Sequence, residues 1–509
     1  MKLLTAILLA GIFNCAWNDT HANNVQIANL VLTGQDTVNN TYQIQFDLTW
    51  ENSWRTSTFE SNWDAVWVFA KYRLAPAGDW HHCMLDTSGT VAASGSTVSL
   101  PEDMDVVTSL PIWLGAFVYR ESDGIGDVSY TGLELRWNYG ANGIDDFDVV
   151  DISMFAIEMV YIPEGPFYLG DGSVSNIEGQ FDHEFSGNPY FVASEAAFDV
   201  GGNAPANQLT TNNGTGMSIP DDFAVDLMTY VVPAEYPKGY AAFYIMKYEM
   251  SQGQYTDFLN HLTQQQASNR YADEYGNARY TIDSISTLQE NTYAVTAPDW
   301  PCGWLNWDDA SAYADWAALR PLTELEYEKA ARGPLSPATH EFAWGTPFIH
   351  TSGYATINDS SATEVITNPG SGTGNANFFP TGGGVLYRCG IFAASALSPV
   401  RDETGSSYYG VMEMSGNLME IYVTIGSAAG RQFVGVSGDG ELDMAGDDDA
   451  GWPGEDGTGA TPVAWRGGSY NDNIPRRLET SNRLNGAAGN AGVLARGANV
   501  SVRLGRASQ

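Results

Sequence analysis

The stretch LNWDDASAYADWAALRPLTELEYEKAARG, residues 305–333, carries the clearest structural signals in the chain. Thr323 and Glu326 stand three residues apart, which is the spacing of a capping box, where both side chains satisfy free backbone N–H groups at a helix start. Gly333 and Pro334 then supply a stop, because glycine ends helices readily and proline cannot continue them. The stretch therefore predicts a short, well-marked helix between Thr323 and Gly333.

Two further helices flank this one in the sequence. The apolar residues after Ser251 and those after Asp308 recur at helical spacing: Tyr255, Phe258, Leu259 and Leu262 in the first case, and Tyr313, Trp316 and Ala317 in the second. From about Ile152 onward such short helices stand among long glycine-rich loops. This change in sequence pattern indicates a second domain over residues 151–509, with little regular secondary structure.

The region before this domain has a different pattern. Between Asn23 and Asn142 the apolar residues alternate with period two, most clearly at Tyr42, Ile44, Phe46, Leu48 and Trp50. Further strand-like runs are DAVWVFAKYRL, LPIWLGAFVYR and VSYTGLELRW, with turn-forming residues between them. The pattern predicts an antiparallel, immunoglobulin-like β-sandwich over residues 23–150, and an α+β class for the whole chain.

The first 22 residues have the pattern of a secretory signal peptide. Lys2 precedes the apolar run LLTAILLAGIF, and small-residue cleavage is expected after Ala22, so that the mature chain begins near Asn23. An alternative makes Cys15 a lipidated amino terminus. No later run of 18 apolar residues is present, so no transmembrane segment is expected. A secreted or extracellular-surface location follows as an expectation.

The chain is strongly acidic, with 61 acidic against 23 basic residues and a net charge of −38. Such a charge repels phosphate backbones, so nucleic acid is not an expected partner. The segment Gly435–Gly459 has eight acidic residues and eight glycines and is predicted to be a surface loop. An alternative is a calcium-ordered loop, because Asp439, Glu441 and Asp443 alternate as oxygen ligands often do.

Three cysteines remain after the predicted signal peptide: Cys83, Cys302 and Cys389. An odd number allows at most one disulfide within the chain. Cys302 and Cys389 lie in the same predicted domain and are the candidate pair in an oxidising compartment. The sequence leaves open whether they are bonded.

Five segments, in this order, resemble the formylglycine-generating enzyme, or sulfatase-modifying factor, domain family. They are EMVYIPEGPFYLG (158–170), YIMKYEMSQGQYTDFLN (244–260), the stretch 305–333, YGVMEMSGNLMEIYV (409–423) and WRGGSY (465–470). Together they cover roughly residues 152–506. The resemblance implies a C-type-lectin-like fold with short helices and long loops, often rigidified by calcium.

The enzyme branch of this family oxidises a substrate cysteine to formylglycine with two copper-binding cysteines. They stand two and seven residues after the aromatic residue of the RGGS-aromatic motif, which is Tyr470 here. The matching positions hold Asp472 and Arg477, and neither offers a thiolate for Cu(I). Copper is therefore not expected.

A second branch uses iron held by closely spaced histidines, and no HxxxHxE spacing occurs among His81, His82, His183, His261, His340 and His350. Iron is therefore not expected either. A metal-dependent enzyme with a non-standard site, an oxidase or a non-haem iron enzyme, remains the alternative.

One calcium site carries over from the resemblance. In the family the ion is held around the SGNxWE motif, and the matching positions are Glu413, Gly416, Leu418 and Glu420. Carboxylates at both ends suit a hard cation. A second family site would use Asn377 and Phe378, but no carboxylate stands at the matching downstream position.

These observations favour a non-catalytic protein that binds a glycan or a protein, or that assembles into an extracellular structure. Arg and Tyr are common anchors of binding surfaces, and Asn both donates and accepts hydrogen bonds. An edge strand such as VQIANLVL is a template for self-assembly. Alternatively, Arg477 and Arg483 pair with carboxylates and brace the C-terminus. The candidate ligand-binding residues are Arg466, Tyr470, Asn471, Asp472, Asn473, Arg477, Asn482, Arg483 and Asn485.

Overall fold

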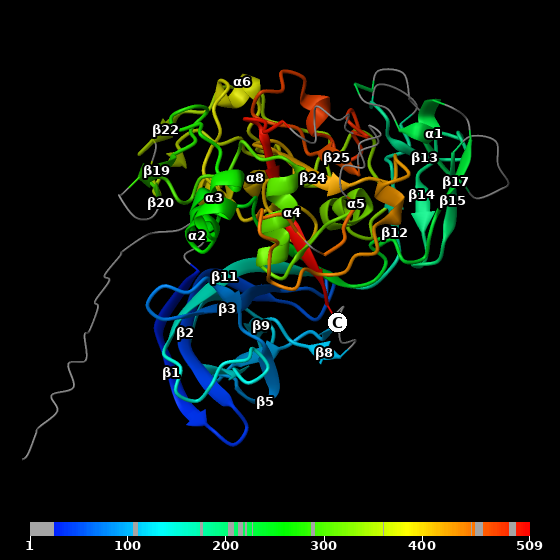
Figure 1. Ribbon diagram of the computed structural model, residues 1–509. Coiled ribbons are helices and arrows are strands. Elements are labelled where there is room, and N and C mark those ends of the chain that lie inside the picture. Colours follow the sequence, from blue (N-terminus) through cyan, green and yellow to red (C-terminus); the bar gives the residue numbers. More distant parts are fainter. Residues whose placement is uncertain are drawn as a thin grey trace, which may run out of the picture.

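The computed structural model describes residues 25–104, 110–173, 177–201, 208–211, 217–218, 221–225, 228–286, 291–359, 361–448, 450–453, 462–487 and 495–508. The predicted signal peptide and Cys15 lie outside these residues. The described part is a mixed α/β structure with mostly strands and a few short helices (Figure 1). None of its helices has the length and apolar composition needed to cross a bilayer.

Two antiparallel sheets form the N-terminal part. The first has the strand order β1 (Gln26–Asp36), β2 (Thr41–Arg55), β10 (Gly124–Asn138) and β5 (Leu85–Val91). The second includes β3 (Asp64–Leu74), β4 (His81–His82), β9 (Ala116–Arg120) and β6 (Ser96–Ser99). On β2, Ile44, Phe46, Leu48 and Trp50 are all buried, which confirms the predicted period of two. They share one hydrophobic cluster with Val66, Val68 and Ala70 of β3, so side chains of both sheets contribute to one core.

The strand β11 (Val150–Ile162) joins the two parts of the molecule (Figure 1). It pairs with β3 along its length, from Val150–Leu74 to Val160–Asp64, and its last four residues also pair with β18 (Phe243–Met246). Beyond β18 the same sheet continues into β27 (Leu504–Ala507) and β21 (Arg320–Pro321). The boundary predicted between residues 150 and 151 therefore falls at the start of a strand that belongs to both parts.

Four capped helices pack on this framework: α2 (Gln252–Asn260), α3 (Gln264–Arg270), α4 (Trp307–Trp316) and α5 (Glu324–Arg332). The predicted capping box of Thr323 and Glu326 is confirmed at the start of α5. The helix expected after Asp308 already begins at Trp307, because Asn306 is its N-cap and accepts a hydrogen bond from the Asp309 N–H. All of α5 is buried, so it is the central helix of this part.

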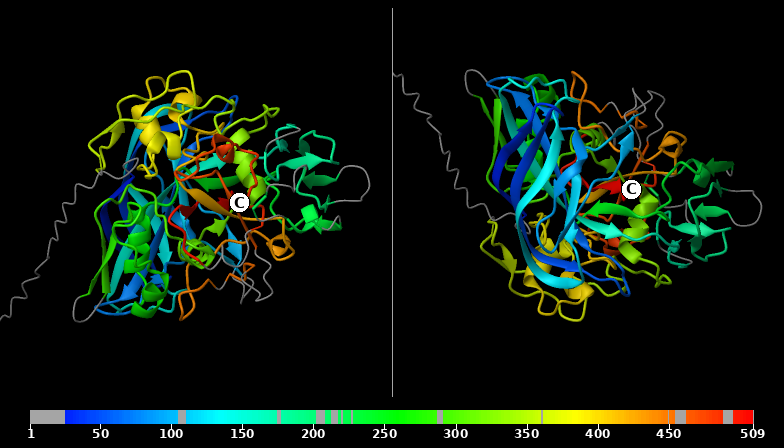
Figure 2. Two further views of the ribbon diagram at one scale, coloured as in Figure 1. Left: turned by 90° about the horizontal axis from the view of Figure 1, so that it is seen from above. Right: turned by 90° about the horizontal axis from the view of Figure 1, so that it is seen from below.

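A small three-stranded sheet covers α5. It consists of β25 (Val463–Arg466), β24 (Met419–Val423) and β26 (Val500–Val502). A further four-stranded sheet projects at one end of the molecule (Figure 2). Its strands, in order, are β13 (Phe181–His183), β16 (Leu209–Thr211), β15 (Phe198–Gly201) and β17 (Thr229–Val232). The other short elements are β7 (Asp103–Met104), β8 (Pro111–Ile112), β12 (Phe167–Leu169), β14 (Tyr190–Val192), α1 (Asp222–Val225), β19 (Ile282–Ser286), β20 (Asn291–Val295), β22 (Thr356–Ile357), β23 (Val365–Ile366), α6 (Phe379–Gly382), α7 (Ile391–Ser395), α8 (Arg401–Thr404), η1 (Gly430–Gln432) and η2 (Pro475–Leu478).

The described part of the acidic segment Gly435–Gly459 docks onto the N-terminal sheets. Lys71 on β3 donates a hydrogen bond to the Gly440 carbonyl. Glu441 accepts a 2.6 Å hydrogen bond from the His82 N–H and lies 3.1 Å from Nδ1 of His81. The segment is thus more than a solvated insertion, because it links the two parts of the molecule.

The three alternating acids of this segment do not converge on one point in the way a cation site requires. Asp439 accepts from the Glu441 N–H, Glu441 contacts the two histidines, and Asp443 accepts from the N–H groups of Ala445 and Asp447. Each carboxylate is therefore already used in holding the segment in place.

Candidate functional site

The RGGSY motif lies where β25 ends and a loop turns back toward η2. Gly467 and Gly468 have φ angles of 88° and 67°, a region that strongly favours glycine. A Cβ at Gly468 would lie only 2.8 Å from the Arg477 carbonyl oxygen. The two glycines are therefore required for the loop to fold back and bring residue 477 close to residue 472.

Asp472 and Arg477 form an ion pair on this loop. Their Oδ1 and Nη1 atoms are 2.9 Å apart, and 12% and 34% of their side chains are exposed. The second oxygen of Asp472 accepts hydrogen bonds from the N–H (2.8 Å) and hydroxyl (3.1 Å) of Ser469. The two positions that the resemblance assigns to copper-binding cysteines are thus occupied by a carboxylate and a guanidinium bonded to each other.

Arg466 and Arg483 do not face a ligand, contrary to the prediction. Both side chains are fully buried. Arg466 contacts Glu324 and Glu328 at 3.1 and 2.7 Å. Arg483 contacts Asp221 and Glu324 at 2.8 and 2.7 Å. Arg483 and Arg466 thus supply counter-charges to the buried carboxylates of α5.

Two more predicted ligand-binding residues are also internal. Tyr470 is 3% exposed and packs in a cluster with Leu386 and Leu418. Asn482 is buried, and its amide donates a 2.7 Å hydrogen bond to Glu178. Asn485 is half-buried, and its main chain bridges to Trp465. These positions hold the loop in shape and leave little surface for a ligand.

The accessible part of the predicted site is smaller and includes residues that the sequence reading missed. Phe379 is 51% exposed and Val385 is 37% exposed. The Phe379 N–H donates a 2.9 Å hydrogen bond to the Asp472 carbonyl, which joins this turn to the loop. The Asn471 face, as we name it, consists of Phe379, Val385, Asn471, Asp472, Asn473 and Arg477.

The predicted calcium positions lie around β24, where two carboxylates have different surroundings. Glu420 accepts hydrogen bonds from Nε (2.9 Å) and Nη2 (2.5 Å) of Arg503. Glu413 accepts a 3.0 Å hydrogen bond from the Gly390 N–H through one oxygen. Its other oxygen is buried and has no hydrogen-bond partner among the described residues. Burial raises the pKa of Glu413 to about 7.

A third carboxylate, Glu249, lies beside these two and was missed by the sequence reading. Its oxygens accept 2.7 Å hydrogen bonds from the Leu418 N–H and the Asn417 amide. Burial, and then the charge of Glu420, raise its pKa well above the usual range. In the part of the chain that the structure describes, no three His, Cys, Asp or Glu side chains are grouped to hold a metal. The predicted set has only two such side chains, and Arg503 already neutralises one of them.

Cys83, Cys302 and Cys389 are all free, buried thiols. The candidate disulfide between Cys302 and Cys389 is therefore not formed in this structure. The Cys302 N–H bonds to the Met250 carbonyl and the Cys389 N–H to the Asp299 carbonyl, so each lies in its own packed segment. Burial raises the pKa of each thiol well above its ordinary value, which disfavours the reactive thiolate.

Comparison with known proteins bears on the fold of the region that carries these residues. A family model described as a sulfatase-modifying factor enzyme 1-like domain matches residues 155–495. The formylglycine-generating enzyme of Streptomyces coelicolor is 50% identical over 48 residues, which are 9% of this chain and 15% of that protein. The enzyme of the same name from Bos taurus is 26% identical over 173 residues, 29% of this chain and 46% of that protein. The alignments thus span less than half the length of these relatives.

Proposed function

Because the chain belongs to the sulfatase-modifying factor domain family over residues 155–495, we propose that it keeps the family's scaffold for binding without the chemistry of the enzyme branch. The observation that carries this proposal is the ion pair between Asp472 and Arg477. Cu(I) prefers soft thiolate ligands, and this pair offers none. The described thiols are buried with raised pKa values, so none of them stands ready to replace the missing pair.

The Asn471 face is the part of this scaffold that we propose to contact a partner. Asn471 and Asn473 are exposed amides, and Phe379 adds an exposed ring beside them. Amides donate and accept hydrogen bonds as sugar hydroxyls and peptide groups do, and an aromatic ring supplies apolar contact. This chemistry fits a glycan or a protein surface outside the cell. The two N-terminal sheets, taken as a β-sandwich, and the lectin-like C-terminal part belong to the same proposal.

Calcium is part of the proposal in a structural role. The unsatisfied oxygen of Glu413 is a fitting ligand for a hard cation, and the carbonyls of Gly416 and Leu418 follow in the same loop. A bound calcium ion would supply charge compensation there. Glu420 contributes less, because Arg503 already holds it.

The loss of chemistry is tested with a cysteine-containing peptide and Cu(I) under air, with mass spectrometry to detect conversion of the thiol to an aldehyde. The expected result is no turnover by the natural protein. The doubly substituted Asp472→Cys, Arg477→Cys protein serves as the matched comparison. Turnover by the unsubstituted protein would restore the alternative of an enzyme with a non-standard site.

The binding role is tested on an array of glycans with the calcium-loaded protein. We expect Asn471→Ala and Phe379→Ala each to lower the bound signal about tenfold, because each removes one contact of the Asn471 face. Gln265→Ala, on the exposed side of α3, is the matched control and should leave the signal unchanged. Glycan binding that survives both substitutions would place the binding surface elsewhere.

A further inference from the structure

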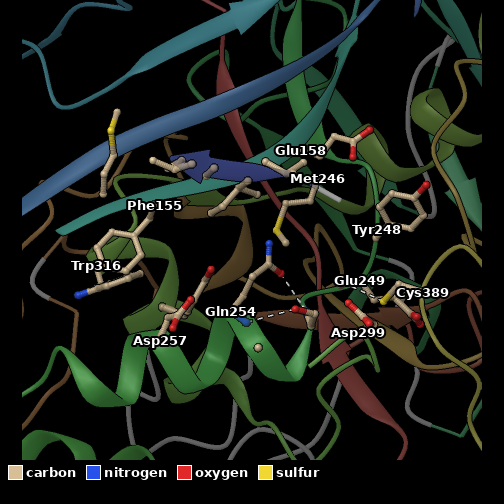
Figure 3. Close-up of a pocket in the computed structure, with 18 residues that line it drawn as sticks. Phe155, Glu158, Met246, Tyr248, Glu249, Gln254, Asp257, Asp299, Trp316 and Cys389 are labelled. Carbon is tan, nitrogen blue, oxygen red and sulfur yellow. Dashed lines mark hydrogen bonds between the residues drawn. The ribbon is translucent and has the colours of Figure 1, made fainter. Parts of the chain in front are cut away.

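A hollow of about 230 Å³ lies where the N-terminal sheets meet the family domain. Its roof is formed by β1, β11 and β18, and its floor by α2, as the close-up shows (Figure 3). Phe155, Trp316 and Asp257 lie toward one end, and Glu249 and Cys389 toward the other. The hollow is distinct from the Asn471 face, none of whose residues lines it.

The wall of the hollow is acidic. Glu158, Glu249, Asp257 and Asp299 line it, whereas no Lys, Arg or His is among the described residues that do. Glu158 is neutralised from outside by Lys247, which forms a buried ion pair with it. Glu249 is satisfied by the hydrogen bonds described above. Of the four acids, Asp257 is the one at the aromatic end of the hollow (Figure 3).

Asp257 is a carboxylate that the protein leaves uncompensated. Its side chain accepts no hydrogen bond and forms no ion pair with any group that the structure describes. Asp257 is exposed and lines the hollow, and the protein packed around the rest of its carboxyl group raises its pKa to about 6. His261 contacts the main-chain oxygen of Asp257, but burial lowers the pKa of this ring to about 4, so it supplies no charge.

The wall next to Asp257 is apolar and aromatic. Phe155 and Trp316 form an edge-on pair with ring centroids 4.8 Å apart, and Met246 extends from the roof (Figure 3). Aromatic faces attract organic cations, and the attraction grows when water is excluded. A carboxylate beside such rings suits a ligand that joins a positive charge to an apolar body.

We propose that this hollow binds a small organic ammonium ion, with its charge on Asp257 and its apolar body against Phe155, Trp316 and Met246. An apolar cavity of about 150 Å³ is already large enough for benzene, so the space suffices for an aryl-alkyl amine. The inference is independent of the Asn471 face, and either site can fail without the other.

The test is isothermal titration calorimetry of the full protein with 2-phenylethylammonium chloride, compared with the neutral alcohol 2-phenylethanol. We expect the ammonium ion to bind and the alcohol to bind at least about tenfold more weakly, because a charge-assisted hydrogen bond is lost. Asp257→Asn should weaken the ammonium ion about tenfold while leaving the alcohol unchanged. Asp283→Asn, an exposed acid on β19, makes the same change in net charge and should have no effect.

A second variant keeps the proposal testable if Asp257→Asn does not fold. Phe155→Leu retains the carboxylate and removes one ring, so it should weaken the ammonium ion by roughly threefold to tenfold. Absence of heat with the natural protein at millimolar amine would overturn the proposal. So would equal binding of amine and alcohol, or unchanged affinity in both Asp257→Asn and Phe155→Leu.

Discussion

The arginines of the loop after β25 differ in function because they differ in burial. Arg483 has no exposed side-chain surface and lies between Asp221 and Glu324, whereas Arg477 is 34% exposed and has one partner, Asp472. A charge removed from a buried network leaves its partners desolvated and unpaired, but water compensates the partner of an exposed pair. The first arginine therefore contributes to folding and the second to the surface.

We expect Arg483→Met to lower the free energy of unfolding by about 3–5 kcal/mol, because buried Asp221 loses its counter-charge and buried Glu324 keeps only Arg466. Arg477→Met is the matched substitution at the exposed pair and should cost about 1 kcal/mol or less. Chemical denaturation of the two variants measures the difference. Similar losses in both would show that burial does not separate their roles.

Glu479 gives a prediction about pH. It is buried, lies 3.3 Å from His340, and has a pKa raised to about 7 by burial. The folded protein thus holds this proton more tightly than the unfolded chain, so the stabilisation is full below about pH 4.5 and is lost as pH rises to about 7. Glu479→Gln should reduce the decrease in the free energy of unfolding between about pH 4.5 and about pH 7 by about 1–3 kcal/mol. Identical pH profiles of melting temperature for both proteins would contradict the assignment.

At the level of elements, local signals in the sequence were sufficient to predict α2, α4 and α5, but not the other short helices. The capping box at Thr323 and Glu326 depends on residues three apart, so it could be recognised without knowing the fold. The burial of Arg483 could not be predicted in this way, because its partner Glu324 stands 159 residues away in the chain. The exposed ring of Phe379 was missed for the same reason, since a turn distant in sequence brings it to Asp472.

The acidic segment is the element whose character changes most between sequence and structure. Its composition predicts a loop, which the described part is, but the contacts of Glu441 with His81 and His82 make it a link between the two parts. Which of its many acids would find a partner depended on the placement of β3 and β4. Composition alone contains no such information.

Glu441→Gln should therefore loosen this link in a pH-dependent way. Its hydrogen bond and charge raise the pKa of His81, so the pair stabilises the fold below about pH 6.5 and the effect is lost as pH rises through the folded value. We expect the free energy of unfolding of the variant to be lower by about 1 kcal/mol or less at pH 6. At pH 8.5, where His81 is neutral, the part of this loss that is due to His81 should be almost absent. Glu121→Gln, at an exposed acid, is the control. Equal losses at the two pH values would rule out His81 as the partner that matters.

At the scale of the whole molecule, one sheet makes the two parts a single unit. Every residue of β11 from Val150 to Val160 pairs with β3, and its end pairs with β18. Lys247 at the end of β18 also reaches Glu158 on β11 within the same buried region. The sequence predicts a domain boundary near residue 151, where the structure has the start of β11, but alternating apolar residues do not reveal which distant strand will be the neighbour.

This arrangement predicts the behaviour of fragments. Residues 23–150 alone leave one edge of the buried strand β3 without its partner β11, so this fragment should aggregate or melt without cooperativity. Residues 23–162 include all of β11 and should melt more cooperatively. Circular dichroism melting and size-exclusion chromatography compare them directly. A well-folded 23–150 fragment would show that β11 is not needed for the N-terminal sheets.

We propose that the ion pair of Asp472 and Arg477 stands where the enzyme branch of the family has its copper-binding cysteines. Elemental analysis after equilibration with Cu(I) and removal of unbound metal tests it most directly, on the natural protein and on Asp472→Cys, Arg477→Cys. We expect less than about 0.1 bound copper ion per chain in the natural protein, because none of its described thiols is exposed. One copper per chain in the natural protein would contradict it and would mean that this scaffold still holds a reactive metal.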